Sequence, residues 1–249
     1  MRLLIKNGRV IDPANNIDAE LDILVENSKI AKIAKAITSN KVDETIDAGG
    51  KIVMPGLVDM HTHLREPGRP DKESVETGTL AALRGGVTSV VAMPNTYPAI
   101  DSPENVRLLK DIVSRTAKVD VFVCASITKA RRGEELTEAA KLKKEGVIAI
   151  SDDGVSVDNA DLMLKALQKA RAAKMLVISH CEDKLLSGSG VVNRGIIATR
   201  LGLRGISNES EYKRVERDIH LAAKAGAALH IAHVSCKESV ELIAKAKNR

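Results

Sequence analysis

Aromatic side chains are almost absent from this sequence of 249 residues, which contains one Phe, two Tyr and no Trp. Sites that bind nucleic-acid bases or sugars by stacking need aromatic faces, so the composition argues against a stacking platform for either ligand. A hydrophobic core must instead be built from Ile, Leu, Val and Ala.

Paired cysteines, a secretory leader and long apolar runs are also lacking. The three cysteines are widely spaced, and none belongs to a Cys-x-x-Cys pair. An odd number of cysteines without a secretory segment indicates a reducing compartment. Residues 1–8 become polar too early for a signal peptide, and no apolar run approaches the roughly 20 residues that span a bilayer. We therefore expect a cytoplasmic protein without membrane contact.

The charge is only modestly one-sided, with 38 Lys and Arg against 33 Asp and Glu, a formal net charge of +5. The basic residues alternate with Glu along amphipathic stretches, which is typical of solvated helix faces rather than of a nucleic-acid surface. With 44% apolar and 29% charged residues, the chain has the composition of a globular protein of one large or two smaller domains.

The pattern of apolar runs changes near residue 52. Residues 1–52 read as short strands and turns, with a hairpin predicted at Asn7-Gly8, and we expect a small β-sandwich module there. Residues 53–249 alternate strands with helical patterns, which predicts an α/β fold with a parallel sheet and outer helices. The six predicted strands are 52–60, 87–93, 119–127, 147–150, 176–178 and 228–234. A TIM-type (β/α)8 barrel would need two more units, so the barrel is expected to be incomplete.

The first of these strands ends in His61-Thr62-His63, and Arg65 follows. Side chains alternate between the two faces of a strand, so both imidazoles should point the same way, about 7 Å apart. Neutral imidazole is a favoured ligand of divalent metals, and two on one face could hold one ion. Arg65, a further even step along, is expected on the same side.

Four more polar residues lie at the ends of later strands. His180 ends the fifth, His233 ends the sixth, and Asp152-Asp153 follow the fourth. In barrel enzymes the chemistry is carried at the C-terminal ends of the strands. Four of the six histidines therefore meet there, with a carboxylate, and the pattern predicts a metal site.

Other polar residues near these segments have simpler expected roles. His230 lies an odd number of residues from His233 and should face the opposite side, and His220 lies within a helical pattern. Cys181 is expected to be a buried, inert thiol. Asp59 shares the face of His61 and is expected to orient a ligand histidine.

Five segments of the chain, in this order, resemble the amidohydrolase superfamily and, within it, dihydroorotases of the bacterial type that use Asp in place of a carboxylated Lys. The resemblance extends over residues 1–249. The segments are Asp47 through Met54-Pro55-Gly56 to His61-Thr62-His63-Leu64-Arg65-Glu66-Pro67-Gly68, then Met93-Pro94-Asn95-Thr96, Ser151-Asp152-Asp153-Gly154, His180-Cys181-Glu182-Asp183 and His230-Ile231-Ala232-His233-Val234-Ser235.

The resemblance implies a centre of one or two zinc ions. His61 and His63 would bind one ion, and Asp153 would bridge it to a second held by His180 and His233. The implied reaction is the reversible cyclisation of N-carbamoyl-L-aspartate to L-dihydroorotate in pyrimidine biosynthesis.

The resemblance also implies that His63, Arg65 and Asn95 bind this substrate, with Arg65 and Asn95 on its carboxylate. A guanidinium fork matches a carboxylate with two hydrogen bonds. Two alternatives stay open at this point: Arg65 could form a surface salt bridge, and Asn95 could serve only a turn.

The sequence departs from the family in one respect. The family's eighth strand supplies an Asp that binds zinc and acts as the general base, within Asp-His-Ala-Pro-His, and this stretch does not occur here. No catalytic base can therefore be assigned. We expect a C-terminally truncated dihydroorotase that binds metal with little turnover, and whose open sheet exposes apolar edge strands.

Two other functions remain open. Another cyclic-amide hydrolase, such as a dihydropyrimidinase or an allantoinase, would usually carry a carboxylated Lys where Asp153 stands. An inactive dihydroorotase-like protein that binds aspartate transcarbamoylase would have no need of the histidines, so metal content separates it from an enzyme. Assembly into a homo-oligomer is also open.

Overall fold

The computed structural model describes residues 1–39 and 41–247. The chain divides into two compact units, residues 1–57 and the residues from 58 onward. The sequence-based boundary at residues 52/53 remains a prediction.

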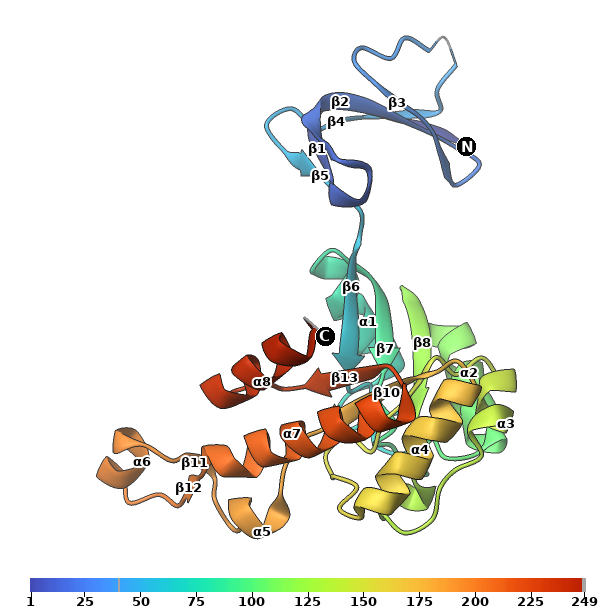
Figure 1. The fold of residues 1–249 in the computed structure, drawn as a ribbon. Helices are drawn as coiled ribbons and strands as arrows, with labels where there is room; N and C mark the ends of the chain where they lie inside the picture. The colour runs from blue at the N-terminus through green and yellow to red at the C-terminus, as the bar shows by residue number, and fades with distance from the viewer. Residues whose placement is uncertain (40, 248–249) are drawn as a thin grey trace. The chain divides into compact units, whose positions relative to one another are not determined.

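The first unit is one mixed sheet. Its strands are β1 (Arg2–Asp12), β2 (Ile17–Glu26), β3 (Lys29–Ala34), β4 (Glu44–Asp47) and β5 (Ile52–Val53). The order is β3-β2-β1-β4, and β5 also pairs with β1 (Figure 1). The pairs β1–β2 and β2–β3 are antiparallel, whereas β4 and β5 run parallel to β1. The described residues of this unit thus form a single layer, without the second sheet of a sandwich.

The hairpin predicted at Asn7-Gly8 is wrong, because both residues lie inside β1. The register shifts there by a bulge between Ile5 and Gly8, and Asn7 adopts φ 61°. Bulges and hairpin turns both use left-handed backbone, so the same dipeptide suits either. The strand instead turns at the 3-10 helix η1 (Pro13–Asn15). A Cβ at Gly8 would lie 2.6 Å from Cγ2 of Val53, so the approach of β5 also requires glycine.

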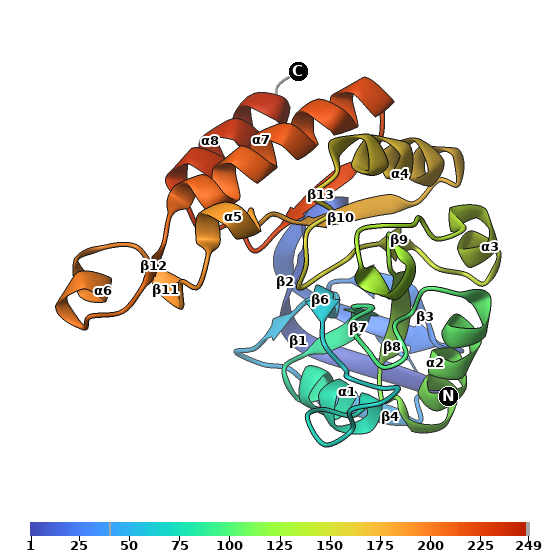
Figure 2. The same ribbon diagram turned by 90° about the horizontal axis from the view of Figure 1, so that it is seen from below.

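The second unit contains a parallel sheet of six strands, in agreement with the six predicted. They are β6 (Leu57–Thr62), β7 (Val87–Ala92), β8 (Asp120–Ala125), β9 (Ala149–Ile150), β10 (Leu176–His180) and β13 (Leu229–Ala232). The order is β13-β10-β9-β8-β7-β6, so consecutive strands of the chain are neighbours. The sheet curls and carries its helices on the outer side, as in part of a (β/α) barrel (Figure 2).

Helices follow most of the strands, and residues with known capping preferences lie at several of their ends. They are α1 (Val75–Arg84), α2 (Pro103–Thr116), α3 (Ala139–Lys144), α4 (Ala160–Ala172), α7 (Asn208–Ala225) and α8 (Lys237–Lys247). Pro103 opens α2, whose cap is Ser102, and Asn159 caps α4. Gly226, in the left-handed region, ends α7.

An excursion of short elements separates β10 from α7. It contains α5 (Lys184–Ser187), β11 (Val192–Asn193), α6 (Ile196–Arg200) and β12 (Gly205–Ile206). A second 3-10 helix, η2 (Lys129–Arg131), lies in the loop after β8.

The core of the second unit lies between the sheet and the helices and consists of aliphatic side chains. Val75, Val106, Leu109, Leu142 and Leu167 have no exposed surface. The scarcity of aromatic residues is thus met by close packing of aliphatic residues, as expected.

The two end strands of this sheet, β6 and β13, each have a single neighbour in the described part of the chain. On β6, Val58 is 62% and Met60 43% exposed. The exposure of apolar edge residues predicted from the sequence is therefore confirmed for β6. Among the described residues, we find no helix with both the length and the apolar character needed to cross a membrane.

Candidate metal centre

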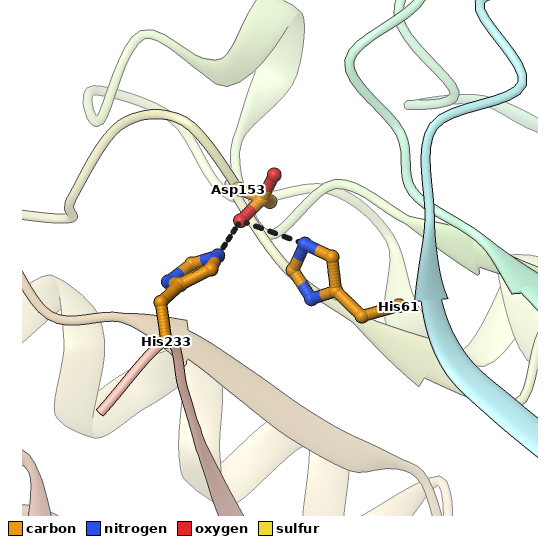
Figure 3. Close-up of side chains that lie close together, drawn as sticks. All are labelled: His61, Asp153 and His233. Atoms are coloured by element: carbon orange, nitrogen blue, oxygen red, sulfur yellow. Dashed lines mark ion pairs between the residues drawn. The ribbon is translucent and has the colours of Figure 1, made fainter. Parts of the chain in front are cut away.

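The C-terminal ends of the six parallel strands meet at one edge, which we call the rim. His61 lies on β6, His180 is the last residue of β10, and His233 follows β13. His63 lies just beyond β6, and Asp153 lies three residues after β9. Figure 3 shows three of these side chains, from three separate segments, pointing toward one another.

All four imidazoles surround the carboxylate of Asp153. The Nε2 atoms of His61 and His233 lie 3.4 and 2.9 Å from Oδ1, and Nδ1 of His180 lies 3.4 Å from the same oxygen. Nε2 of His63 lies 3.4 Å from Oδ2. Neighbouring rings have centroids 4.7 to 5.1 Å apart. The structure thus brings together the five residues that the sequence suggested as ligands.

These residues fit a divalent metal ion. Ligand atoms of His61, Asp153 and His233 all lie within 4.8 Å of one another. Nε2 of His61, Oδ1 of Asp153 and Nδ1 of His180 are buried without a hydrogen-bond partner in the described residues. An unsatisfied buried polar atom costs about 1–3 kcal/mol, which a bound cation would offset. Imidazole nitrogen and carboxylate oxygen are also the donors that zinc accepts in proteins.

Electrostatics favour the unprotonated forms that bind metal. Burial raises the pKa of Asp153, but the imidazoles of His180, His233 and His61 around its carboxylate outweigh this effect and hold the pKa well below the usual range. Burial lowers the pKa of His63, against an opposing effect of the hydrogen bond with Asn95. Both side chains are therefore in the metal-binding state at neutral pH.

Asn95 fixes the orientation of His63. Its Oδ1 lies 2.9 Å from Nδ1 of His63. Because the amide oxygen only accepts, Nδ1 carries the proton and Nε2 is left as a donor atom facing Asp153. The Nδ2 group of Asn95 has no hydrogen-bond partner in the described residues, so it is available to a ligand.

His180 has a carboxylate behind it that sequence reasoning missed. Nε2 of His180 lies 3.4 Å from Oε2 of Glu182, which also accepts a hydrogen bond of 3.0 Å from Nζ of Lys184. Burial raises the pKa of Glu182, but Lys184, Ser187 and His180 lower it to about 2. A carboxylate behind a ligand histidine orients the ring, and the spacing His-x-Glu was the available signal.

Arg65 lies beside His63, although not for the predicted reason. Strand β6 ends at Thr62, and Arg65 has φ 56°, so strand alternation does not extend to it. It lies within electrostatic range of His63 and of Arg131. No carboxylate in the described residues forms an ion pair with Arg65, so the alternative of a surface salt bridge is not what the structure contains.

Asp152, the neighbour of Asp153, is a structural residue. Its Oδ1 accepts hydrogen bonds from the backbone N–H groups of Ile127 (2.8 Å) and Thr128 (3.0 Å). Its Oδ2 accepts one from the Thr128 hydroxyl. These bonds tie the loop after β9 to the segment after β8 and leave Asp153 on the side of the histidines.

The loop that carries His233 is held by Glu211 of α7. The carboxylate of Glu211 accepts hydrogen bonds from the backbone N–H groups of Ser235 (3.0 Å) and Cys236 (3.2 Å) and from the Ser235 hydroxyl. His233 itself has φ 47°, a left-handed conformation that this anchoring holds. Nothing local in the sequence indicated this contact.

A second carboxylate of α7 anchors the strand of His180. Oδ2 of the buried Asp218 accepts a hydrogen bond of 2.5 Å from Oγ of Ser179, and Oδ1 lies 2.6 Å from the guanidinium of Arg217. Helix α7 thus holds both neighbouring strand ends in place.

Asp59 does not orient a ligand ring, contrary to the prediction. It is exposed, and its Oδ1 accepts a hydrogen bond of 3.0 Å from the backbone N–H of His61. At the edge of the sheet, a carboxylate can bond to its own chain two residues on, as Asp commonly does.

The three cysteines are free and buried, which agrees with the expectation for Cys181. Burial, with Asp218 nearby, raises the pKa of Cys181 to about 12. A thiol that holds its proton so strongly is a poor metal ligand.

Comparison with known proteins agrees with this centre. Residues 50–239 match the family model described as Dihydro-orotase-like. All 249 residues align with a dihydroorotase of Elusimicrobium minutum (strain Pei191), at 53% identity. A dihydroorotase of Thermoanaerobacter sp. (strain X514) is 49% identical over 250 aligned positions. The chain spans 57% of the length of each relative.

Solved structures share the fold. An L-hydantoinase (dihydropyrimidinase) from Arthrobacter aurescens superposes with a TM-score of 0.82 at 24% identity, over 99% of this chain and 56% of its own. A dihydropyrimidinase from Brevibacillus agri NCHU1002 gives 0.77 at 26%, over 100% of this chain and 55% of its own. The sequence relatives are far closer, and they decide the family. The chain belongs to the dihydroorotase family.

Proposed function

We propose that the protein to which these residues belong catalyses the reversible cyclisation of N-carbamoyl-L-aspartate to L-dihydroorotate. The observation that carries this proposal is the convergence of four imidazoles on the buried carboxylate of Asp153. The printed names of relatives about half identical over the whole chain support the choice of reaction.

We propose His61, His63, Asp153, His180 and His233 as the ligands of one or two zinc ions. A bound zinc ion would act as a Lewis acid on the amide carbonyl and would lower the pKa of a water ligand toward neutrality. Imidazoles lie near both oxygens of the Asp153 carboxylate, which supports the proposal that two ions could share it.

The substrate carries carboxylates, and we propose His63, Arg65 and Asn95 as its binding residues. The Asn95 amide would donate from Nδ2 while its oxygen keeps His63 oriented. The Arg65 guanidinium would supply a two-pronged donor to the same carboxylate. No residue of this chain is assigned the proton transfer, so we propose that the 249 residues alone bind metal with little turnover.

Three further assignments are proposals of the same kind. Three buried cysteines without disulfide bonds support a reducing, cytoplasmic location. Assembly with further copies of the chain, or with aspartate transcarbamoylase, stays a prediction from the sequence.

The test compares substrates and metal content in one preparation. The zinc-loaded protein, expressed at the length that its gene encodes, is assayed with dihydroorotate, dihydrouracil and allantoin, and its zinc is measured by mass spectrometry. We expect turnover of dihydroorotate above the other two, and one or two zinc ions per chain. Preference for dihydrouracil or allantoin would favour another cyclic-amide hydrolase, and a protein without metal would refute the proposal.

A further inference from the structure

A second guanidinium, that of Arg131, lies beside the metal centre and has no role in the account above. Arg131 ends the 3-10 helix η2 in the loop after β8 and has φ 55°. Its Nη1 donates a hydrogen bond of 2.6 Å to the backbone carbonyl of Asp153. The side chain therefore reaches from its own loop into the loop that carries the central carboxylate.

The charge of Arg131 has no carboxylate in contact with it. No ion pair within 4.0 Å involves Arg131 in the described residues, and its Nε is buried without a hydrogen-bond partner there. The charged groups that face it are the carboxylates of Asp152 and Asp153 and the guanidinium of Arg65. The oxygens of Asp152 are occupied by Ile127 and Thr128, and those of Asp153 face the imidazoles.

Gly154 leaves an opening next to these donors. A Cβ at this position would lie 3.6 Å from Nη1 of Arg131 and 4.0 Å from Nδ2 of Asn95. Gly154 is exposed and has φ +84°, a conformation that disfavours a side chain. Two donor groups from separate loops therefore border the same point, and the backbone there carries no side chain that would fill it.

We propose that Arg131 is a further substrate-binding residue, which forms with Arg65 and the Nδ2 group of Asn95 an anion site that selects a carboxylate-bearing substrate over a neutral cyclic amide. This inference rests on the proposed function. Two guanidiniums near one another are unfavourable until an anion lies between them, and a half-buried guanidinium gains more from such a partner than an exposed one. Nδ2 of Asn95 has no acceptor in the described residues, and Nη1 of Arg131 bonds only to the backbone carbonyl of Asp153, so a bound carboxylate would give both groups a charged acceptor.

The competing explanation is that Arg131 only supports the loop of Asp153 through the carbonyl bond. The two roles predict different effects when Arg131 is replaced. A supporting residue, once replaced, would disturb the metal ligands, whereas an anion-binding residue would weaken only ligands with a carboxylate.

The experiment measures ligand binding by calorimetry in the zinc-loaded protein at the length its gene encodes. The probes are orotate, which carries a carboxylate, and acetohydroxamate, which binds the metal and carries none. We expect Arg131→Gln to weaken orotate binding by roughly 10- to 100-fold, because charge-assisted hydrogen bonds are lost. Zinc content and acetohydroxamate affinity should stay unchanged. The orotate affinity of Arg131→Lys should lie between those of the unmodified protein and Arg131→Gln, because Lys keeps the charge but lacks the planar guanidinium group.

The matched control is Arg132→Gln, since Arg132 is the next residue, is exposed and should leave both affinities unchanged. With dihydroorotate as substrate, Arg131→Gln should raise KM with little change in kcat. Equal orotate affinity in Arg131→Gln and the unmodified protein would overturn the inference, and so would a parallel loss of zinc and acetohydroxamate. If the unmodified protein neither binds orotate nor converts dihydroorotate, the proposed function itself fails.

Discussion

The adjacent carboxylates of Asp152 and Asp153, in the loop after β9, face opposite sides of this loop. Both are almost fully buried, at 2% and 3% exposure. On the inner side, the oxygens of Asp152 accept three hydrogen bonds from Ile127 and Thr128. On the rim side, those of Asp153 meet only imidazoles, and Oδ1 has no hydrogen-bond partner in the described residues. Burial alone does not distinguish a structural carboxylate from a metal ligand, but the identity and number of its donors do.

The pKa directions of the two carboxyl groups express the same contrast. Burial raises the pKa of Asp152 above the usual value, because its hydrogen bonds offset only part of the desolvation. Three histidines hold the pKa of Asp153 well below the usual value despite its burial. The neighbouring groups, rather than the depth of burial, therefore decide whether the pKa of each carboxyl group is raised or lowered.

The largest expected effect comes from Asp153→Asn. Because all four imidazoles converge on this carboxylate, we expect zinc affinity to fall by more than about 100-fold, beyond the loss typical of residues behind a ligand. Competition with a chromogenic chelator measures the affinity. Asp161→Asn, an exposed change in the first turn of α4, should leave it unaltered. Zinc affinity retained by Asp153→Asn would show that the two carboxylates do not differ as described.

Asp152→Ala should show the opposite profile. It leaves two backbone N–H groups and a hydroxyl without their acceptor, so the free energy of unfolding should fall by about 3 kcal/mol. Urea denaturation at neutral pH measures this loss, and zinc bound to the folded fraction should change little. Normal stability combined with lost zinc would reverse the assignment of the two residues.

His233→Ala tests the rim side through one of its imidazoles. We expect weaker zinc binding than in the unmodified chain, but a smaller loss than in Asp153→Asn, because three imidazoles and the carboxylate remain. His230→Ala is the matched control, three residues earlier on β13 and outside the group of ligand atoms. Equal losses in the two variants would contradict the placement of His233 at the centre.

Glu211→Gln is expected to lower the free energy of unfolding by about 1 kcal/mol, since the amide keeps the shape of the carboxylate but loses the charge-assisted hydrogen bonds to Ser235 and Cys236. Burial raises the pKa of Glu211, but these bonds and Ser239 lower it below the usual value of 4.5. A carboxyl group whose pKa is lower when folded stabilises the protein above its unfolded pKa and loses this effect as the pH falls. The difference in unfolding free energy between the unmodified protein and Glu211→Gln, measured with urea, should therefore shrink below about pH 4.5. A difference that grows there would contradict the lowered pKa of Glu211.

The smallest expected effect is that of Asp59→Asn. Its carboxylate is exposed and bonds only to the backbone of His61, so stability should stay within about 0.5 kcal/mol and zinc affinity should not change. Chelator competition and urea denaturation check both values. A marked loss of zinc would restore the predicted role of Asp59 in orienting a ring.

The sequence predicted the strands and the histidines at their ends because both follow from local patterns. Apolar runs alternating with capped helices define the parallel sheet, and parallel strands bring their C-terminal ends together. What sequence reasoning missed depends on contacts between distant loops. Arg131 meets the residue 22 positions later, and Glu211 holds Ser235, 24 positions later. The position of Arg65 was predicted from the alternation of side chains along a strand, but the strand ends at Thr62, so alternation does not extend to Arg65.

The most direct test of the account is anomalous X-ray diffraction at the zinc edge, from crystals of the zinc-loaded 249-residue chain. We predict anomalous density among the four histidines and Asp153, with ligand distances of about 2.0–2.2 Å. Rings that remain without an ion at full zinc loading, or zinc bound only elsewhere, would contradict the claim that these side chains form a metal centre.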